Sequence, residues 1–194
     1  MKTFAVAAAL VLPVLASTLP AHAQSGGATP AREAAQFDFL IGQWEVALQP
    51  KIGSLAKLIH GQPTLTGSWK AWRAFEGMGV DDELRVVDGS GNPVTLAHAQ
   101  RIYDAKAQRW LISSLDVYRV RFSSATAQWQ AGEMRVDGSG TSADGKPMLT
   151  RTRFHDITAD GFKMRQDRST DNGASWEEGA LVIVAKRVAA KAPR

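Results

Sequence analysis

The chain has 194 residues, no cysteine and a formal net charge of +4. The lack of cysteine excludes disulfides, thiolate nucleophiles and thiolate metal sites. Basic residues are scattered among acidic ones and form no stripe with interleaved aromatics, so the mild positive charge does not indicate a nucleic-acid partner.

Residues 1–23 have the pattern of an export signal. Lys2 is their only charge, residues 4–15 form an apolar run, and residues 21–23 (Ala-His-Ala) give a small-x-small cleavage pattern. The apolar run is too short to span a bilayer, and no later stretch approaches the ~20 apolar residues of a transmembrane helix. We expect cleavage near Ala23/Gln24, a periplasmic or secreted protein, and no integral membrane span. A retained N-terminal anchor is the alternative.

The remaining residues predict a single domain. Residues 30–37 favour a short helix, because proline suits a first helical turn and alanine is a strong helix former. Trp44, Val46 and Leu48 then alternate with other residues, as in a half-buried strand. Residues 51–61 are compatible with a loop or a helical turn. We place a flexible leader and the helix start at residues 24–35, a barrel at 36–187 and a disordered tail at 188–194.

From residue 64 onward, short apolar-polar alternations are separated by turn signals. Asp-Gly pairs and related residues supply the positive φ angles that tight hairpins need. About eight to ten strands without long helices between them predict an all-β, antiparallel, up-and-down barrel, since closure removes exposed sheet edges. No 40–50-residue repeat supports a propeller. The predicted strands cover residues 64–75, 82–87, 94–103, 109–116, 118–122, 127–136, 148–157, 162–169 and 175–186; predicted connections include Asp137-Gly138, Asp144-Gly145, Asp160-Gly161 and Asp171-Asn172-Gly173.

Three segments carry a family resemblance. Residues 37–46 (FDFLIGQWEV) resemble the opening of calycin barrels, with Gly42 and Trp44 matching the lipocalin G-x-W pattern. Together with residues 101–110 (RIYDAKAQRW) and 169–176 (STDNGASW), they are similar to an exported bacterial family of lipocalin-like proteins, distantly akin to nitrobindins. The resemblance covers about residues 36–187. It implies that Trp44 closes one barrel end and that Arg187 lies across its indole.

The segment STDNGASW also matches the Asp-box of sialidases and other propeller enzymes. A propeller repeats this box from blade to blade, and the chain contains it once. We therefore interpret it as a hairpin: Asp171 ties the turn, Gly173 takes its left-handed position, and Trp176 anchors the last strand.

Candidate ligand-binding residues are basic or aromatic. Arg151, Arg153 and His155 share one face of a predicted strand, which is either wetted by solvent or turned inward toward a ligand carboxylate or phosphate. Arg101 and Tyr103 share a face and could form an anion clamp beside an aromatic wall. The tryptophans are more often core than reactive. Among them, Trp69 and Trp110 are candidates for a pocket wall.

Metal and cofactor signals are weak. The histidines show no H-x-x-x-H or H-x-H spacing, so we expect no metal and no cofactor. A nitrobindin-like haem site is the alternative, with His155 or His98 as its ligand. The sequence contains no Gly-x-Ser-x-Gly elbow of the kind that indicates a hydrolase. We interpret Asp81-Asp82-Glu83 as a solvent-exposed acidic run at the edge of a turn.

Three functions stay open. The first is a barrel that binds a small, largely apolar or amphipathic ligand, with or without an anionic end. The second is an enzyme on the same barrel, which predicts a buried titratable group with a perturbed pKa in a water-accessible cavity. The third is haem or nitric-oxide binding. The chain is expected to be a monomer or homodimer.

Overall fold

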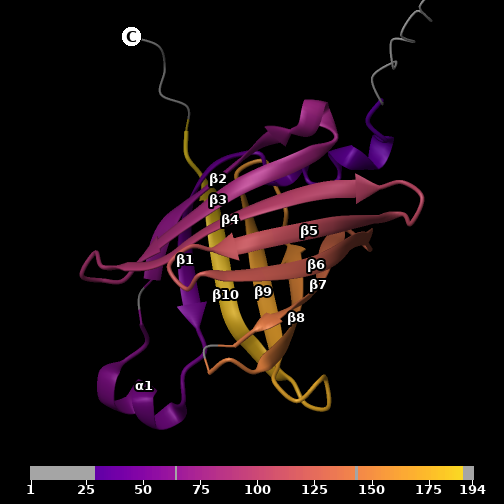
Figure 1. Cartoon of the computed structure of the whole chain (residues 1–194). Helices are drawn as coiled ribbons and strands as arrows, with labels where there is room; N and C mark the ends of the chain where they lie inside the picture. The colour runs from indigo at the N-terminus through magenta and orange to yellow at the C-terminus, as the bar shows by residue number, and fades with distance from the viewer. Residues whose placement is uncertain (1–28, 64, 143, 190–194) are drawn as a thin grey trace, which may run out of the picture.

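The computed structural model describes residues 29–63, 65–142 and 144–189, which form an antiparallel barrel of ten strands (Figure 1). Each strand pairs with its neighbours in the chain, and β1 pairs with β10 to close the sheet. The all-β, up-and-down barrel predicted above is therefore confirmed. The strands are β1 (Gly42–Pro50), β2 (Leu65–Ala74), β3 (Gly79–Val87), β4 (Pro93–Asp104), β5 (Arg109–Asp116), β6 (Arg121–Gln130), β7 (Glu133–Thr141), β8 (Pro147–His155), β9 (Gly161–Ser169) and β10 (Glu177–Arg187).

Alternation of side chains decides which strand face enters the barrel. In β1, Trp44, Val46 and Leu48 are buried and the residues between them are exposed. The register aligns Trp44 with Arg187 of β10 and Trp69 of β2, so all three residues belong to the inner face. Period-two patterning is the direct cause, because successive strand residues point to opposite sheet faces.

The predicted short N-terminal helix is present and takes the 3₁₀ form. Residues 30–37 and their neighbours make two short 3₁₀ turns, Arg32–Ala35 and Asp38–Leu40. These turns tuck Phe37 and Leu40, both fully buried, into the barrel end, and the Trp44 Nε1 donates to the Leu40 carbonyl at 2.7 Å. A third 3₁₀ turn, Phe75–Gly77, joins β2 to β3. Residues 51–61, left open by the sequence, contain the helix α1 (Ser54–His60).

The predicted strands 118–122 and 127–136 are also wrong. β6 and β7 instead meet at Ala131 and Gly132, which take φ angles of +51° and +81°. Asp137-Gly138 lies within β7 and is not a turn. A Cβ at Gly138 would stand 2.5 Å from the Thr150 Oγ1 across the sheet, so this glycine serves close packing.

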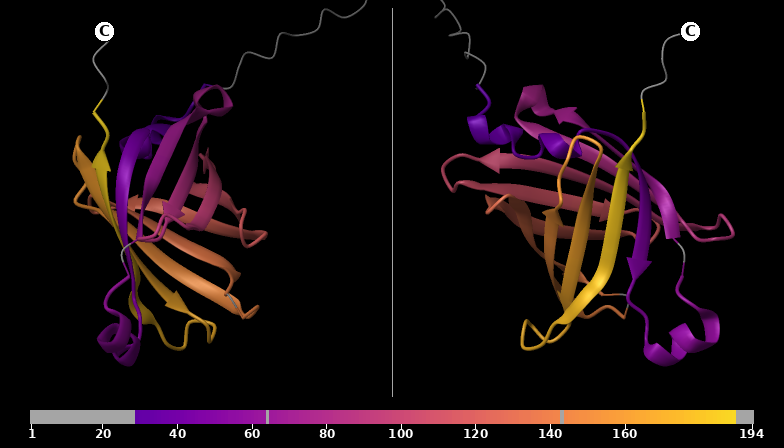
Figure 2. Two further views of the ribbon diagram at one scale, coloured as in Figure 1. Left: turned by 90° about the vertical axis from the view of Figure 1, so that its left-hand side faces the viewer. Right: turned by 180° about the vertical axis from the view of Figure 1, so that it is seen from behind.

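The barrel has two unlike ends. The N-terminal 3₁₀ turns lie at the closed end, where β1 begins (Figure 2). A dense aromatic core fills this end. At the mouth, where β1 ends, the chain passes through α1 and the hairpin loops β3–β4, β5–β6, β7–β8 and β9–β10. The core of the closed half includes Phe37, Leu40, Trp44, Trp110, Met134, Phe154 and Phe162. No helix within the described residues has the length and apolar character needed to cross a membrane.

Candidate ligand-binding site

The half of the barrel interior nearer the mouth is hollow. A cavity of about 360 Å³ extends from Trp69 in the middle of the barrel to the strand ends at the mouth, where Arg121 and Met148 border it. Apolar side chains on its wall include Leu84, Ile112, Phe154 and Met164, and polar ones include Ser114, Thr150, Thr152 and Gln166. The lining is therefore amphipathic.

Small inward residues create this space. Ala97 and Ala99 of β4, Ala125 of β6, and Gly138 and Gly140 of β7 stand at positions where the closed half carries aromatic or long side chains. Strand spacing is constant along a barrel, so short side chains leave volume that long ones would fill. The cavity is thus a consequence of residue size at particular registers.

A buried ion pair forms the cavity floor. Asp82 of β3 and Arg101 of β4 are 3% and 5% exposed, and the guanidinium Nη1 contacts the Asp82 Oδ2. The Trp69 Nε1 donates to the other carboxylate oxygen, Oδ1, at 2.7 Å. The three side chains are thereby held together, since removing any one would leave a buried polar partner unsatisfied.

Arg101 keeps its charge despite this burial. Desolvation lowers the pKa of Arg101 to about 10, and the nearby Asp81 carboxylate opposes that shift. The guanidinium is therefore cationic at neutral pH. Its Nε has no hydrogen-bond partner among the described residues, and its Cζ lies 5.1 Å from the centre of the Phe37 ring on the closed side.

Asp82 is the residue that the sequence interpretation missed. Asp81-Asp82-Glu83 was expected to be a solvated run at a turn edge, but it lies within β3, and Asp82 points inward. The available signal was alternation: Val80, Asp82, Leu84 and Val86 share one strand face, and three of them are apolar. An acid on such a face needs a buried partner, which Arg101 supplies.

Tyr103 and Trp110 belong to the packed half. They are cross-strand partners with ring centres 5.6 Å apart, and the Trp110 Nε1 donates to the Gln36 Oε1 at 3.1 Å. Trp110 is fully buried and borders none of the cavity described above. Of the predicted ligand-binding residues, only Arg101 and Trp69 line the cavity.

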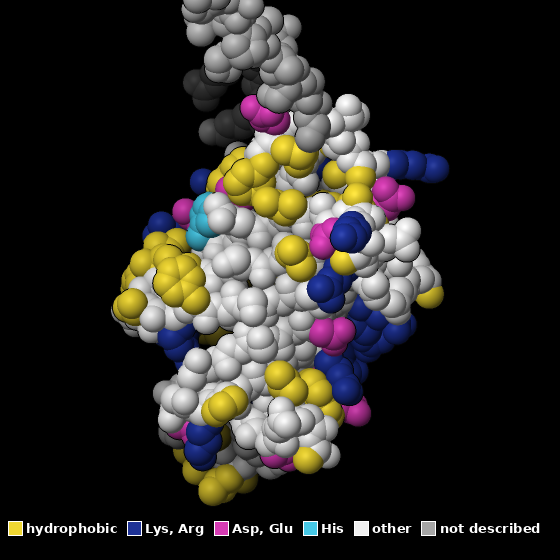
Figure 3. All heavy atoms as spheres, turned by 45° about the vertical axis from the view of Figure 1, so that its right-hand side comes forward, with side chains coloured by type: hydrophobic (Ala, Val, Ile, Leu, Met, Phe, Trp, Pro, Cys, Tyr) yellow, Lys and Arg dark blue, Asp and Glu magenta, His cyan; other side chains and the backbone are white. Residues whose placement is uncertain are grey.

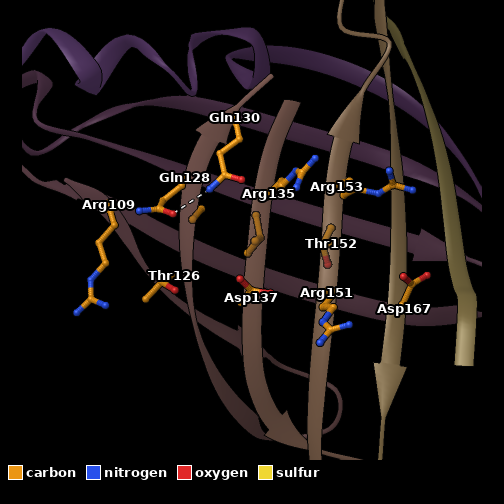
Figure 4. Close-up of a pocket in the computed structure, with 12 residues that line it drawn as sticks. Arg109, Thr126, Gln128, Gln130, Arg135, Asp137, Arg151, Thr152, Arg153 and Asp167 are labelled. Carbon is orange, nitrogen blue, oxygen red and sulfur yellow. Dashed lines mark hydrogen bonds between the residues drawn. The ribbon is translucent and has the colours of Figure 1, made fainter. Parts of the chain in front are cut away.

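Arg151, Arg153 and His155 lie on the outer barrel face, as the solvent-wetted alternative predicts. Figure 4 shows the two arginines with Arg109 and Arg135 around a shallow outer groove of about 410 Å³ over β6–β9. Their inward neighbours in β8 are Thr152 and Phe154, both buried. The inward anion site considered for these arginines is therefore wrong.

Nearby groups already engage much of the charge in this outer groove. The Arg151 guanidinium stacks 3.8 Å from the centre of the Trp176 ring. Arg135 and Arg153 both approach Glu133, at 3.7 and 3.9 Å. Exposed pairs of this kind contribute little to stability, but they lower the net positive charge that an anion would meet.

Neither candidate haem ligand reaches the barrel interior. His98 lies outside, with its Nε2 3.7 Å from Asp81 and its ring 5.8 Å from that of Trp72. The His155 Nδ1 lies 3.4 Å from the Asp156 carboxylate on the outer surface. Within the described part of the chain, no group of three His, Cys, Asp or Glu side chains is placed to hold a metal ion.

Arg187 clamps the closed end. Its Cζ lies 3.9 Å from the centre of the Trp44 ring, and its guanidinium donates to the carbonyls of Ala159 and Ile41 at 2.5 and 3.0 Å. Gly42 has a φ of +132°, and a Cβ there would stand 2.3 Å from the Arg187 Nη1. Only glycine combines this backbone with room for the guanidinium.

The STDNGASW segment forms the β9–β10 turn at the mouth. Asp171 accepts hydrogen bonds from the Ser175 amide at 2.9 Å and from the Ser169 hydroxyl at 2.7 Å. The hydrogen bond from the Ser175 hydroxyl is the largest of several that lower the pKa of Asp171 to about 2. Gly173 has a φ of +88°, and the Trp176 Nε1 donates to its carbonyl at 3.1 Å.

Comparisons with known proteins add little to this description. No family model matches the chain, and no curated protein matches it. The solved structure of EF1p2_mFAP2b bound to DFHBI is similar to it at a TM-score of 0.42 and 11% sequence identity, over 80% of this chain and 98% of that chain. A likeness at so low a TM-score supports no conclusion, and the barrel assignment rests on the strand pairing above.

Proposed function

We propose that this protein binds a small amphipathic molecule in the hollow half of its barrel. The observation that carries the proposal is a cavity of about 360 Å³ above the buried Asp82–Arg101 pair. This volume lies within the range of small-ligand pockets, roughly 300–1,000 Å³. Its mixed lining favours a ligand with an apolar body and a few polar atoms over a purely hydrocarbon one.

The lining suggests how such a ligand would lie. An apolar body would pack against Ile112, Phe154 and Met164, while hydroxyl or carboxylate groups would meet the hydroxyls of Ser114 and Thr150. Arg101 and Asp82 balance each other, so the floor offers hydrogen-bonding groups with little net charge. The proposed ligand therefore needs no full negative charge, although one is compatible with Arg101.

The alternatives have less support. A catalytic acid or base should titrate near neutral pH, whereas Arg101, with its pKa of about 10, stays protonated there. The haem alternative requires an interior histidine, and neither His98 nor His155 is one. Binding without a cofactor is the simpler proposal.

The cellular setting is part of the proposal. We propose an exported, lipocalin-like protein, supported by the signal pattern of residues 1–23 and by the contact of Arg187 with the G-x-W tryptophan, Trp44. The N-terminal sequence of protein recovered from a periplasmic extract tests export, because cleavage would leave Gln24 as the first residue.

Two matched phenylalanine substitutions, one inside the cavity and one outside it, test the ligand site. Ser114 faces the cavity and its neighbour Ser113 faces outward, so Ser114→Phe fills the cavity while Ser113→Phe adds the same ring outside. The probe is 8-anilinonaphthalene-1-sulfonate, an aromatic body with one anionic group, titrated by fluorescence. We expect Ser114→Phe to weaken its binding at least about tenfold, since the ring occupies the same volume.

Folding of both variants is checked by circular dichroism and thermal melting. Ser113→Phe should bind the probe as the unmodified protein does. Equal probe affinities for folded Ser114→Phe and Ser113→Phe would contradict an interior site.

A further inference from the structure

Two apolar segments project from the mouth of the barrel. The first is α1, in which Leu55, Leu58 and Ile59 are 69%, 83% and 63% exposed. The second, residues 117–122, comprises the β5–β6 connection and the first two residues of β6, and its Val120 and Phe122 are 81% and 71% exposed. We call the two together the rim segments. Large aliphatic and aromatic side chains this exposed, in clusters, mark interaction surfaces.

α1 lacks the packing that stabilises most short helices. All of its side chains from Ser54 to Ile59 are exposed, so none of them packs into the barrel. A seven-residue helix is marginal in water without tertiary contacts. Burial of its apolar side chains against an external apolar partner would therefore stabilise this helix.

The rim segments flank the mouth on opposite sides. The β1–β2 connection and the β5–β6 loop lie at the same barrel end, and β5 is separated from β2 by β3 and β4 around the closed sheet. Figure 3 shows hydrophobic side chains gathered at the lower edge, at the left and near the top of this face. Phe122 also borders the ligand cavity, so the loop joins this surface to the proposed site.

The basic excess at the mouth is confined to the rim segments, because the β3–β4, β7–β8 and β9–β10 loops contain the acids Asp88, Asp144 and Asp171. Residues 51–60 contain Lys51 and Lys57 and no acid, and residues 117–122 contain Arg119 and Arg121 and no acid. One acid, Asp116, precedes the second segment and pairs with Arg119. Exposed apolar tips flanked by Lys and Arg are the composition that binds the headgroup and acyl boundary of anionic bilayers.

We propose that the mouth of the barrel docks on an anionic lipid surface, with the apolar side chains of α1 and of residues 117–122 inserted and their basic residues at the headgroups. Docking in this orientation would turn the cavity opening toward the bilayer. An amphipathic ligand could then enter from the membrane, and this last step alone rests on the proposed function.

Sedimentation with vesicles tests the docking. Residues 24–194, which retain every strand and turn described, are mixed with vesicles of phosphatidylglycerol and phosphatidylethanolamine, or of phosphatidylcholine alone. We expect binding to the anionic vesicles, weakened by salt. The double variant Leu58→Ser/Phe122→Ser should lose roughly tenfold or more in affinity. Ile102→Ser/Leu111→Ser, at two 44% exposed positions on the outer barrel wall, is the matched control and should bind normally.

Site-specific labels test the orientation. Because the chain has no cysteine, Leu58→Cys, Val120→Cys and Leu111→Cys can each carry one environment-sensitive dye. With anionic vesicles, the dyes at Leu58 and Val120 should shift to the blue and the dye at Leu111 should not. A shift at Leu111 equal to that at the rim would overturn the proposed orientation.

The same experiments separate lipid from a second copy of the chain. If the protein stays in the supernatant with anionic vesicles, the proposal is wrong. A dimer in analytical ultracentrifugation that dissociates in Leu58→Ser/Phe122→Ser would then assign the rim to self-association. The probe titration of Ser114→Phe does not involve vesicles, so the ligand site can fail while docking stands, and the reverse.

Discussion

The two halves of this barrel have the same backbone and opposite interiors. In the closed half, the side chains of Phe37, Trp44, Trp110 and Met134 are fully buried and belong to one hydrophobic core. In the hollow half, alanine, glycine and serine occupy several inward positions of β4 to β7, and a cavity remains there. Leu48, Val86 and Ile183 fill the side formed by β1, β3 and β10. The comparison teaches that strand pairing does not determine how the interior is filled. One continuous sheet can enclose a packed core at one end and a cavity at the other.

This division has a physical rationale. Aromatic side chains bury large apolar areas, so one well-packed end can stabilise the whole closed sheet. The other end is then free to keep a void and a buried ion pair, both of which cost stability. The polar floor formed by Asp82 and Arg101 marks the border between the two halves.

Truncation on one strand gives the sharpest test of the difference. Trp110 and Ile112 lie on the inner face of β5, the first fully buried and the second on the cavity wall. We expect Trp110→Ala to lower the free energy of unfolding by about 3–5 kcal/mol. Ile112→Ala should cost about 1–2 kcal/mol, because its side chain is already partly free of contacts. Urea denaturation measures both, and equal costs would remove the distinction between the halves.

The ion pair at the cavity floor predicts that substitutions of Asp82 and Arg101 have strongly coupled effects on stability. Arg101→Leu leaves the Asp82 carboxylate buried without its cation, and we expect a loss of about 3–5 kcal/mol. Asp82→Leu should cost a similar amount, since Arg101 and the Trp69 Nε1 both lose their acceptor. The double variant should recover much of this loss, because no charge then stays buried alone. Additive losses in a double-mutant cycle by urea denaturation would show that the two residues act separately.

The clamp at the closed end should matter less. Arg187→Ala removes the stacking on Trp44 and two hydrogen bonds to backbone carbonyls, and we expect a loss of about 1–2 kcal/mol. Thermal melting measures the loss. Arg187→Lys keeps a charge but not the planar donor pair, so it should recover only part of the stability. Full recovery by lysine would mean that charge alone holds this end.

The smallest predicted effect is at the mouth and depends on pH. The folded pKa of Asp171 is about 2, below the ordinary value of 3.8, so its ionised form stabilises the folded state. That contribution is complete above about pH 4 and disappears as the pH falls through 2. The difference in melting temperature between the unmodified protein and Asp171→Asn should therefore shrink between pH 5 and pH 2. A difference that stays constant over this range would contradict the predicted role of the ionised carboxylate.

Local patterns were sufficient for the barrel itself. The alternation of Trp44, Val46 and Leu48 predicted an inner face, and closely spaced turn signals predicted a meander of about the observed strand number. The turn at Asp171 and Gly173 was also found where the residues predicted it. Turn chemistry and period-two alternation depend on neighbours in sequence, so they can be recognised without the fold.

Glycine shows where local reasoning stops. Gly138 follows an aspartate, as in a hairpin, yet it lies in mid-strand, where Thr150 of β8 approaches it closely. Ala131 and Gly132 make the actual turn, with no Asp-Gly signal. Whether a glycine serves a turn or a close contact depends on a strand distant in sequence.

The site depended still more on tertiary structure. Arg101 was predicted as a ligand-binding residue, but its partner Asp82 and the outward position of Arg151, Arg153 and His155 were not settled by the sequence. Which face of a charged strand turns inward is decided by the register of the closed sheet, since a shift of one residue reverses every side chain.

The sequence by itself therefore determined the class of fold and the final hairpin, because both follow from short patterns of polarity and turn residues. The contact of Arg187 with Trp44 at the closed end was implied by the resemblance to lipocalins. Only the tertiary structure decided which half of the barrel is hollow. It also decided that Asp82 and Arg101 meet at the floor, and that α1 and residues 117–122 flank one mouth. These features depend on the sizes and charges of side chains that are far apart in the chain. Such side chains come together only when the sheet closes.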